Sequence, residues 1–194
     1  MPTDSQALAE RVRAARPADT VRGFIFNGVL RCLKEFAGEA AERECLAKLG
    51  KPRWVEFFSY PVADYLKLAW TGVEFLEPKV GGVEQSFFRL GHYAASSFLT
   101  SAVGKVLTTI AANEPRKMVS NFPTAYKMCV GYGERTLTWS GERSALMAFR
   151  NDFLVPAFHE GAMSGAVSAA GGKDVRVVGK RLSLLDVDYS LTWD

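Results

Sequence analysis

Cysteine and histidine are scarce in this sequence. Its 194 residues include three cysteines, Cys32, Cys45 and Cys129, and two histidines, His92 and His159. An odd number of cysteines without a CxxC pair favours neither a disulfide framework nor a zinc cluster. A reducing cytoplasm is the simpler expectation. We therefore predict a cytoplasmic protein that has no metal site and no cofactor.

Long apolar runs and a strong excess of one charge are also missing. No segment reaches the roughly 18 uninterrupted apolar residues of a membrane span, and the N-terminus lacks the apolar core of a signal peptide. Basic residues number 24 and acidic residues 21, which leaves no strong field to gather phosphates. The basic clusters at 10–22 and 179–182 are interpreted as solvated surface. We expect neither a membrane span nor nucleic-acid binding.

The composition is that of an ordinary globular protein. Apolar residues make up 48% and charged residues 23% of the chain, which excludes disordered, collagen-like and coiled-coil classes. A chain of this length fits one domain. We predict an N-terminal arm or short helix over residues 1–20 and a single α+β domain over residues 21–194.

Helical patterns fill the first two thirds of the chain. Residues 20–36 predict a brief extended entry and then a helix, and residues 40–50 predict a helix of about three turns that Gly50 ends. After a break at Lys51 and Pro52, the Tyr60-Pro61 pair is expected to open a third helix. Its apolar spacing predicts one inward stripe, formed by Val62, Tyr65, Leu66 and Ala69.

Two further helical segments follow. Apolar and small residues recur at helical spacing from Phe87 to Asn113, which predicts a single long central helix. Residues 114–128 predict a turn at Pro115 and another helix ending near Gly131. Phe122-Pro123 would be a kink in it or its start.

The last third of the chain changes to the two-residue period of strands. Leu137 and Trp139 alternate before a predicted turn at Ser140-Gly141, and a second extended run follows. A helix is then expected from Pro156 to Gly171-Gly172, and residues 173–193 alternate again. The order is β-β-α-β-β. We predict an α+β fold in which an N-terminal helical layer packs on a C-terminal antiparallel sheet of two hairpins.

The order of several segments carries a family resemblance over residues 20–193. The segments are TVRGFIFNGVL, YPVADYLKL, FRLGHYAASSF with Gly104 following, FPTAYKM, a GER pair on the first hairpin, DFLVPAFHEGAMSGAV and YSLTW. Together they resemble a myxobacterial family of paralogous proteins without an assigned function. More distantly, the layout is similar to the ligand-binding fold of the 4-vinyl-reductase domain, the haem nitric-oxide-binding domain and the transport-particle subunits of vesicle tethering. The resemblance implies a ligand-sensing or scaffolding fold without a defined catalytic site.

Neither histidine has the surroundings of a metal or haem ligand in the sequence. The haem-binding relatives carry a Tyr-x-Ser-x-Arg string for the propionates, which is absent here, so His92 is interpreted as a helix-edge contact or a pocket-mouth donor to an anion. The fourth residue after His159 is Met163, so no HExxH motif forms. His159 and the adjacent Glu160 point about 100° apart on a helix. We interpret His159 as a satisfied surface or cap residue.

The other catalytic motifs are absent as well. Gly161, Gly165 and Ala169 form a small-residue face that predicts close helix packing, because no strand feeds into a GxGxxG loop. There is no P-loop and no GxSxG elbow. We therefore predict a protein that is not an enzyme, although an acid-base site built from distant Asp and Glu residues stays open.

The leading hypothesis is a non-enzymatic, regulatory or sensory module with an aromatic-rich pocket for a small apolar ligand. The candidate pocket residues are Phe24, Phe26, Tyr65, Phe88, Phe98 and Phe122, with Arg89, His92 and Arg135 as polar groups at the pocket mouth. The alternative is a protein-protein interaction module, a homodimer or signalling scaffold, without a ligand. A transport-particle relative holds an acyl chain on a cysteine, but no motif carries that residue over to this chain.

Overall fold

A computed structural model describes residues 4–50, 53–111 and 114–194. The elements, in chain order, are α1 (Asp4–Ala14), β1 (Thr20–Arg22), α2 (Gly23–Leu49), β2 (Ser59–Pro61), α3 (Val62–Val80), α4 (Val83–Thr100), α5 (Ala102–Ala111), α6 (Pro115–Ser120), α7 (Phe122–Cys129), β3 (Glu134–Gly141), β4 (Ser144–Arg150), α8 (Pro156–Ala169), β5 (Arg176–Arg181) and β6 (Val187–Thr192). The predicted break at Lys51 and Pro52 and the predicted helix end at Asn113 lie outside these residues. The predicted α+β class, with helices first and then β-β-α-β-β, is confirmed.

The first helices follow the expected pattern closely. β1 is the predicted extended entry, and it pairs with β2, a strand that the sequence pattern does not predict. The two helices expected over 20–50 are one element with a break at Gly38, where φ is 87°. Gly50 ends α2 in the left-handed conformation, as predicted, with φ of 63°.

The main core lies between α2, α3 and α4. The predicted inward stripe of α3 is fully buried there, together with Phe26, Val29 and Leu33 of α2. Phe26 stacks on Trp54 with ring centroids 4.8 Å apart and meets Tyr65 edge to face. Aromatic pairs of this kind stabilise a core beyond their buried area.

The prediction of one long helix from Phe87 to Asn113 is wrong. The chain leaves the helical conformation at Ser101, where ψ is 164°, and α5 starts after it. The Ser101 hydroxyl accepts a hydrogen bond from the backbone N–H of Gly104 at 3.1 Å, which caps the new helix. A side chain at Gly104 would collide with the carbonyl of Phe98 at 1.9 Å. A serine cap and one close glycine contact therefore override the continuous helical spacing.

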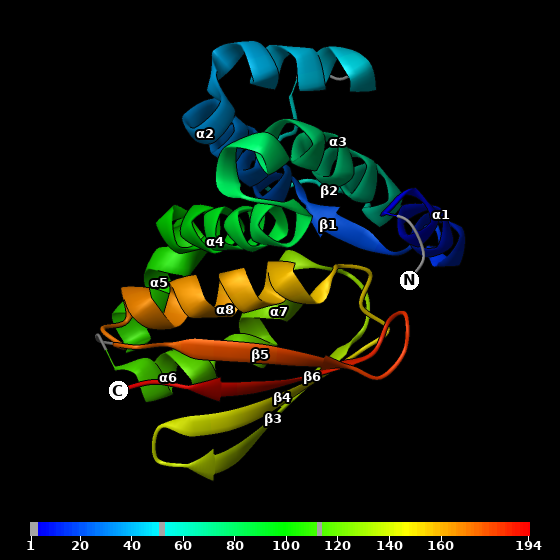
Figure 1. The fold of residues 1–194 in the computed structure, drawn as a ribbon. Coiled ribbons are helices and arrows are strands. Elements are labelled where there is room, and N and C mark those ends of the chain that lie inside the picture. The colour runs from blue at the N-terminus through cyan, green and yellow to red at the C-terminus, as the bar shows by residue number, and fades with distance from the viewer. Residues whose placement is uncertain (1–3, 51–52, 112–113) are drawn as a thin grey trace.

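The four-stranded sheet has the order β3-β4-β6-β5 and is antiparallel throughout. Phe149, Met147 and Ala145 of β4 stand beside Val187, Tyr189 and Leu191 of β6 and form the buried face. Figure 1 shows α8, with the short helices α6 and α7, on this face, while the opposite face is left uncovered. The first hairpin turns at residues 142–143 rather than at Ser140-Gly141, because β3 continues to Gly141.

Helices α4 and α8 lie side by side in close contact, which connects the helical layer to the sheet layer (Figure 1). A Cβ on Gly161 would lie 1.9 Å from the carbonyl oxygen of Phe88, and a Cβ on Gly91 would lie 1.8 Å from that of Phe158. Gly165 packs on the ring of His92. The predicted close packing of the Gly161 and Gly165 face is confirmed.

Helix α1 is held on the body of the protein through Arg11. Its side chain is 1% exposed and its Nη1 atom donates to the carbonyl oxygens of Phe153 at 3.0 Å and Leu154 at 3.4 Å. Burial, with repulsion from Arg181, lowers the pKa of Arg11 to about 10. The interpretation of residues 10–22 as solvated surface is therefore wrong for Arg11. It is also wrong for Asp19, which is buried and pairs with Arg16.

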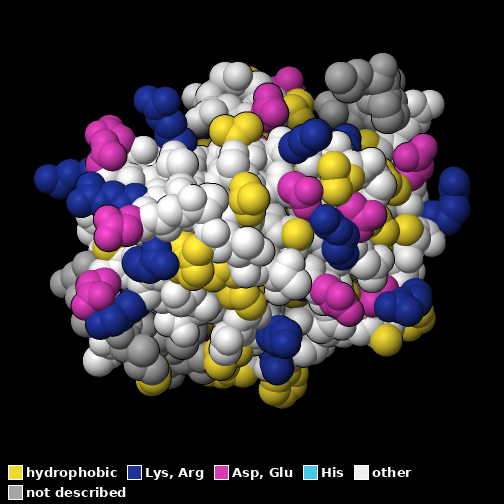
Figure 2. Space-filling view, turned by 90° about the horizontal axis from the view of Figure 1, so that it is seen from below, with side chains coloured by type: hydrophobic (Ala, Val, Ile, Leu, Met, Phe, Trp, Pro, Cys, Tyr) yellow, Lys and Arg dark blue, Asp and Glu magenta, His cyan; other side chains and the backbone are white. Residues whose placement is uncertain are grey.

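Among the residues that the structure describes, no helix is both long enough and apolar enough to cross a membrane. On the side of the molecule shown in Figure 2, hydrophobic side chains occur in small groups between charged ones.

Candidate functional site

An apolar cavity of about 80 Å³ lies where α4, α6, α7 and α8 meet. Phe98 and Leu99 come from α4, Met118 from α6, and Phe122 and Ala125 from α7. Met163 and two alanines of α8 complete the wall on the sheet side. The small side chains leave the space open, because they fill less volume than the aromatic rings around them. The two methionines make an adaptable lining.

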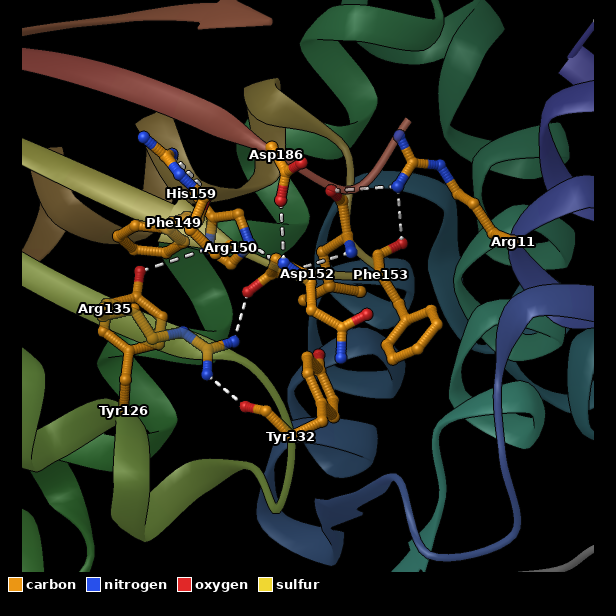
Figure 3. A network of polar contacts seen from close by, with 12 residues as sticks. Arg11, Tyr126, Tyr132, Arg135, Phe149, Arg150, Asp152, Phe153, His159 and Asp186 are labelled. Atoms are coloured by element: carbon orange, nitrogen blue, oxygen red, sulfur yellow. Dashed lines mark hydrogen bonds and ion pairs between the residues drawn. The ribbon is translucent and has the colours of Figure 1, made fainter. Parts of the chain in front are cut away.

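One wall of the cavity carries a polar pair that belongs to a buried network. His159 Nδ1 lies 3.2 Å from the hydroxyl of Tyr126, and His159 Nε2 lies 2.9 Å from a carboxylate oxygen of Asp152. The second carboxylate oxygen of Asp152 accepts from the guanidinium of Arg135, which also donates to the carbonyl oxygen of Tyr132. Figure 3 shows Asp152 between Arg135 and the ring of His159.

The network holds its charges in a dry environment. Burial acts to raise the pKa of Asp152, but His159 and Arg135 together hold it well below its usual value, so the carboxylate is ionised. It therefore accepts hydrogen bonds only, and Nε2 of His159 is the donor to it. In the neutral imidazole, Nδ1 then accepts the hydroxyl hydrogen of Tyr126. Burial and the charge of Asp152 raise the pKa of Tyr126 well above its usual value.

The structure separates the residues that were predicted to form one pocket. Phe98 and Phe122 line the apolar cavity, whereas Phe24 lines a second, polar pocket on the other side of Phe98. Phe26 and Tyr65 lie in the core between α2 and α3.

The three polar candidates and Phe88 lie away from the cavity. Phe88 and Arg89 are half-buried on α4, where the guanidinium of Arg89 packs over the ring of Phe36 at 5.4 Å. His92 is exposed, and burial of part of its ring lowers its pKa. Arg135 is only 7% exposed and pairs with Asp152, so it does not stand at a pocket mouth.

The polar wall of the cavity has no counterpart among the residues predicted from the sequence. The interpretation of His159 as a satisfied surface or cap residue is wrong about its place, because the residue is 1% exposed, although both of its ring nitrogens have partners. Tyr126 is 33 positions before His159, and Arg135 is 17 positions before Asp152. No local motif connects residues so far apart. The one available signal was the pair of segments FPTAYKM and DFLVPAFHEGAM, which carry Tyr126, Asp152 and His159.

The cysteines differ in their surroundings. Cys129 lines the apolar cavity, and burial raises its pKa to about 12. Cys32 and Cys45 are buried in the helical core, where burial raises their pKa values to about 12 and about 11. Such thiols are protonated at neutral pH and weakly nucleophilic.

The fold is similar to that of solved H-NOX proteins. An H-NOX protein from S. oneidensis in the Fe(II)NO ligation state matches with a TM-score of 0.70 and 11% identity, over 89% of this chain and 99% of that chain. The unliganded Fe(II) H-NOX protein from K. algicida matches with a TM-score of 0.67 and 10% identity, over 89% and 96%. An oxygen-binding H-NOX domain related to soluble guanylate cyclases matches with a TM-score of 0.61 and 12% identity, over 89% and 95%.

Proteins of the H-NOX family contain heme. The side chains of this chain that could act as heme ligands do not fit that group. A heme iron needs a free axial donor that projects into a large pocket. His159 is the histidine at the cavity, and both of its ring nitrogens are already hydrogen-bonded. Arg135, a cation that could hold a propionate, is paired with Asp152. In the described part of the chain, His, Cys, Asp and Glu side chains form no group of three that could hold a metal ion.

Comparison at the level of sequence places the chain in a family. No curated protein matches it. The model of the family described as "Protein of unknown function (DUF2378)" matches residues 14–194. The expected resemblance to a family without an assigned function is thereby confirmed, while the expected myxobacterial origin and paralogy stay predictions. The chain belongs to the DUF2378 family.

Proposed function

We propose that the chain is a non-enzymatic sensory or regulatory module that holds a small apolar molecule in the cavity between α4, α7 and α8. The observation that carries this proposal is the cavity itself, an apolar space with a satisfied polar pair at its wall. Ligand sites are mostly apolar, with few polar groups. The fold, which is shared with gas-binding and iron-containing H-NOX proteins, supports the same role. We place the module in the cytoplasm.

The polar pair at the wall of the cavity, Tyr126 and His159, favours a ligand that needs no strong hydrogen-bond partner. Tyr126 and His159 are hydrogen-bonded to each other, and His159 is also bonded to Asp152. An engineered cavity of about 150 Å³ in another protein stays dry and binds benzene. A space of about 80 Å³ suits a smaller apolar group or the end of an acyl chain.

The same groups argue against catalysis at this site. Tyr126 and Cys129 are the nucleophile candidates at the cavity, and burial raises both pKa values. Neither is activated by deprotonation at neutral pH.

The first experiment is a mass spectrum of the purified protein under native and then denaturing conditions. We expect excess mass in the native spectrum that is lost on denaturation, which is the signature of a non-covalent ligand. Mass that survives denaturation would instead indicate a covalent group, such as an acyl chain on a cysteine.

A titration with 1-hexanol and 1-octanol, whose chain ends suit a space of this size, tests the cavity directly. We expect the methyl NMR signals of Met118 and Met163 to shift, because both side chains line the cavity. Ala125→Leu fills the space and should abolish the shifts, whereas Thr124→Leu adds the same side chain at an exposed position and should not. If Ala125→Leu binds these probes like the wild type, the cavity is not the site.

A second function, as a protein-protein interaction module, is favoured by one observation. Leu146 and Val178 are 48% and 62% exposed on the uncovered face of the sheet, on either side of Ser190. Sedimentation equilibrium of the wild type and of Leu146→Ser/Val178→Ser tests for a homodimer. A wild-type dimer that carries no ligand, and that dissociates when the two residues are replaced, would favour this function over the first.

A further inference from the structure

A second pocket, of about 130 Å³, lies between the start of α2, the end of α4 and the loop that precedes β2. Its lining is polar, unlike that of the apolar cavity. The residues used below are Phe24, Asn27 and Arg31 of α2, Glu56 of the loop, and Ser97 and Thr100 of α4.

The uncharged groups of this pocket present hydrogen-bond acceptors. The amide of Asn27 donates to the carbonyl oxygen of Trp54 at 3.1 Å, so its own oxygen remains for the pocket. The hydroxyls of Ser97 and Thr100 donate to backbone carbonyls one turn earlier in α4, at 2.8 and 2.9 Å. Because these hydrogens are engaged, the hydroxyl oxygens offer lone pairs.

Two charged residues, Arg31 and Glu56, also line the pocket. The guanidinium of Arg31 donates to the hydroxyl oxygen of Ser97, which fixes its place and leaves further N–H groups for a ligand. The backbone carbonyl of Glu56 accepts from the N–H of Phe24 at 3.0 Å, which holds the loop against α2. Arg31 and Glu56 line the same space, and no ion pair joins these two described residues to each other. Both charges can therefore act on a ligand in this pocket.

We propose that this pocket binds a small zwitterion that carries a carboxylate and an ammonium group, the chemistry of an α-amino acid. The carboxylate meets Arg31, whose planar fork suits carboxylates. The ammonium group, with three donors and no acceptor, meets Glu56, Asn27 and Thr100. The ring of Phe24 provides an apolar wall for the remaining side chain of the ligand.

This site is separate from the apolar cavity and does not depend on the proposed function. Phe24 lines the polar pocket and Phe98 lines the cavity, and the two rings contact each other with centroids 5.7 Å apart. The ring pair is the partition between them. The two sites therefore require different ligand chemistry.

Isothermal titration calorimetry with each standard L-amino acid tests the proposal. For the tightest binder, the matched amine without the carboxylate and the matched acid without the ammonium group are titrated next; for leucine these are 3-methylbutylamine and 4-methylpentanoate. We expect each analogue to bind about tenfold more weakly or worse, because a charge-assisted contact is lost. Equal binding of either analogue would overturn the zwitterion assignment.

Two variants assign the contacts to residues. Arg31→Gln and Glu56→Gln should each weaken amino-acid binding about tenfold. Both side chains are exposed, so the fold and the melting temperature should be kept. Arg43→Gln, an exposed arginine of α2 outside the pocket, is the control and should bind like the wild type. Absence of binding by every amino acid, or unchanged binding in both variants, would overturn the proposal.

Discussion

The carboxylate of Asp152 lies 2.9 Å from Nε2 of His159, and both side chains are only 2% exposed. The side chain of Arg135, also 2% exposed, pairs with the other carboxylate oxygen. A buried charge is tolerated only when it is paired and hydrogen-bonded. Asp152 meets this condition through two partners that come from α8 and β3, and so it joins the helix to the sheet.

Asp152→Asn should therefore destabilise the protein strongly. The amide keeps the shape of the carboxylate but leaves the guanidinium of Arg135 buried without a counter-ion. We expect a loss of about 3–5 kcal/mol in the free energy of unfolding, measured by urea denaturation. Asp188→Asn removes the partner of Arg150 in an ion pair that is more than 40% exposed and should cost less than about 1 kcal/mol. Equal losses in the two variants would contradict this account.

Because Asp152 is ionised in the folded protein, we expect the stability of the protein to depend on pH in the acid range. The pKa of Asp152 is lowered in the folded protein, so its stabilising effect is complete above the unfolded pKa of about 3.9 and is lost as the pH falls below that value. The difference in urea midpoint between wild type and Asp152→Asn should be constant from about pH 7 to 5 and should shrink below about pH 4. Asp19 and Asp186 also have lowered pKa values, but they are present in both proteins. A difference that stays constant down to about pH 3 would be evidence against the pairing.

Arg11→Ala should release α1 from the body of the protein. The substitution leaves the carbonyl oxygens of Phe153 and Leu154 without this donor and should cost about 2 kcal/mol. Hydrogen exchange should accelerate over residues 4–14 more than elsewhere. Arg13→Ala, on the exposed side of the same helix, should change neither quantity. Unchanged exchange in α1 after the Arg11 substitution would show that other contacts hold the helix.

Gly91→Ala should be strongly destabilising, although alanine is the better helix former. Its Cβ would lie 1.8 Å from the backbone carbonyl oxygen of Phe158, so α4 and α8 must separate. We expect a cost of about 3 kcal/mol in thermal or urea unfolding. Gly72→Ala is the control, because its Cβ meets the side chain of Val29 at 3.2 Å, which can yield. It should cost less than about 1 kcal/mol, since helix propensity offsets the contact. A similar cost in both variants would contradict the close packing of α4 on α8.

Reconstitution with heme should fail to give an H-NOX-like complex. His159 lies at the cavity with both nitrogens engaged, and Arg135 is paired. We expect added hemin to give the same absorption spectrum with the wild type as with the Ala125→Leu variant, whose cavity is filled. A sharp Soret band that appears with the wild type and not with Ala125→Leu would show that the cavity opens to accept the group.

The parts of the fold that local chemistry determines could be predicted. Gly50 ends α2 because a glycine adopts the left-handed conformation easily, and Pro156 starts α8 because its missing N–H is not needed there. The alternation in β6 predicts its buried face because successive strand residues point to opposite sides. The break at Ser101 was missed because a capping hydroxyl and the carbonyl of Phe98, not the apolar period, decide it.

The candidate site was predicted less well, for a physical reason. Aromatic residues are common both in a packed core and in the lining of a cavity. Phe26 and Phe98 therefore look alike in the sequence and differ only in the residues that surround them in the structure. The cavity depends on small residues such as Ala125 standing opposite large ones. Its polar wall depends on contacts between residues that are far apart in the chain, such as Tyr126 and His159.

The contact of Arg11 with the carbonyl oxygen of Phe153 also limits when Arg11 can be buried during synthesis of the chain. The two residues are 142 positions apart, so a ribosome that adds about 5–20 residues per second makes the second roughly 7–30 s after the first. Helix α1 can form as soon as it emerges, but Arg11 has no acceptor until the first hairpin has been translated. Burial of this guanidinium therefore cannot precede the synthesis of Phe153, and it marks a chain in which α1 has met the segment that follows β4.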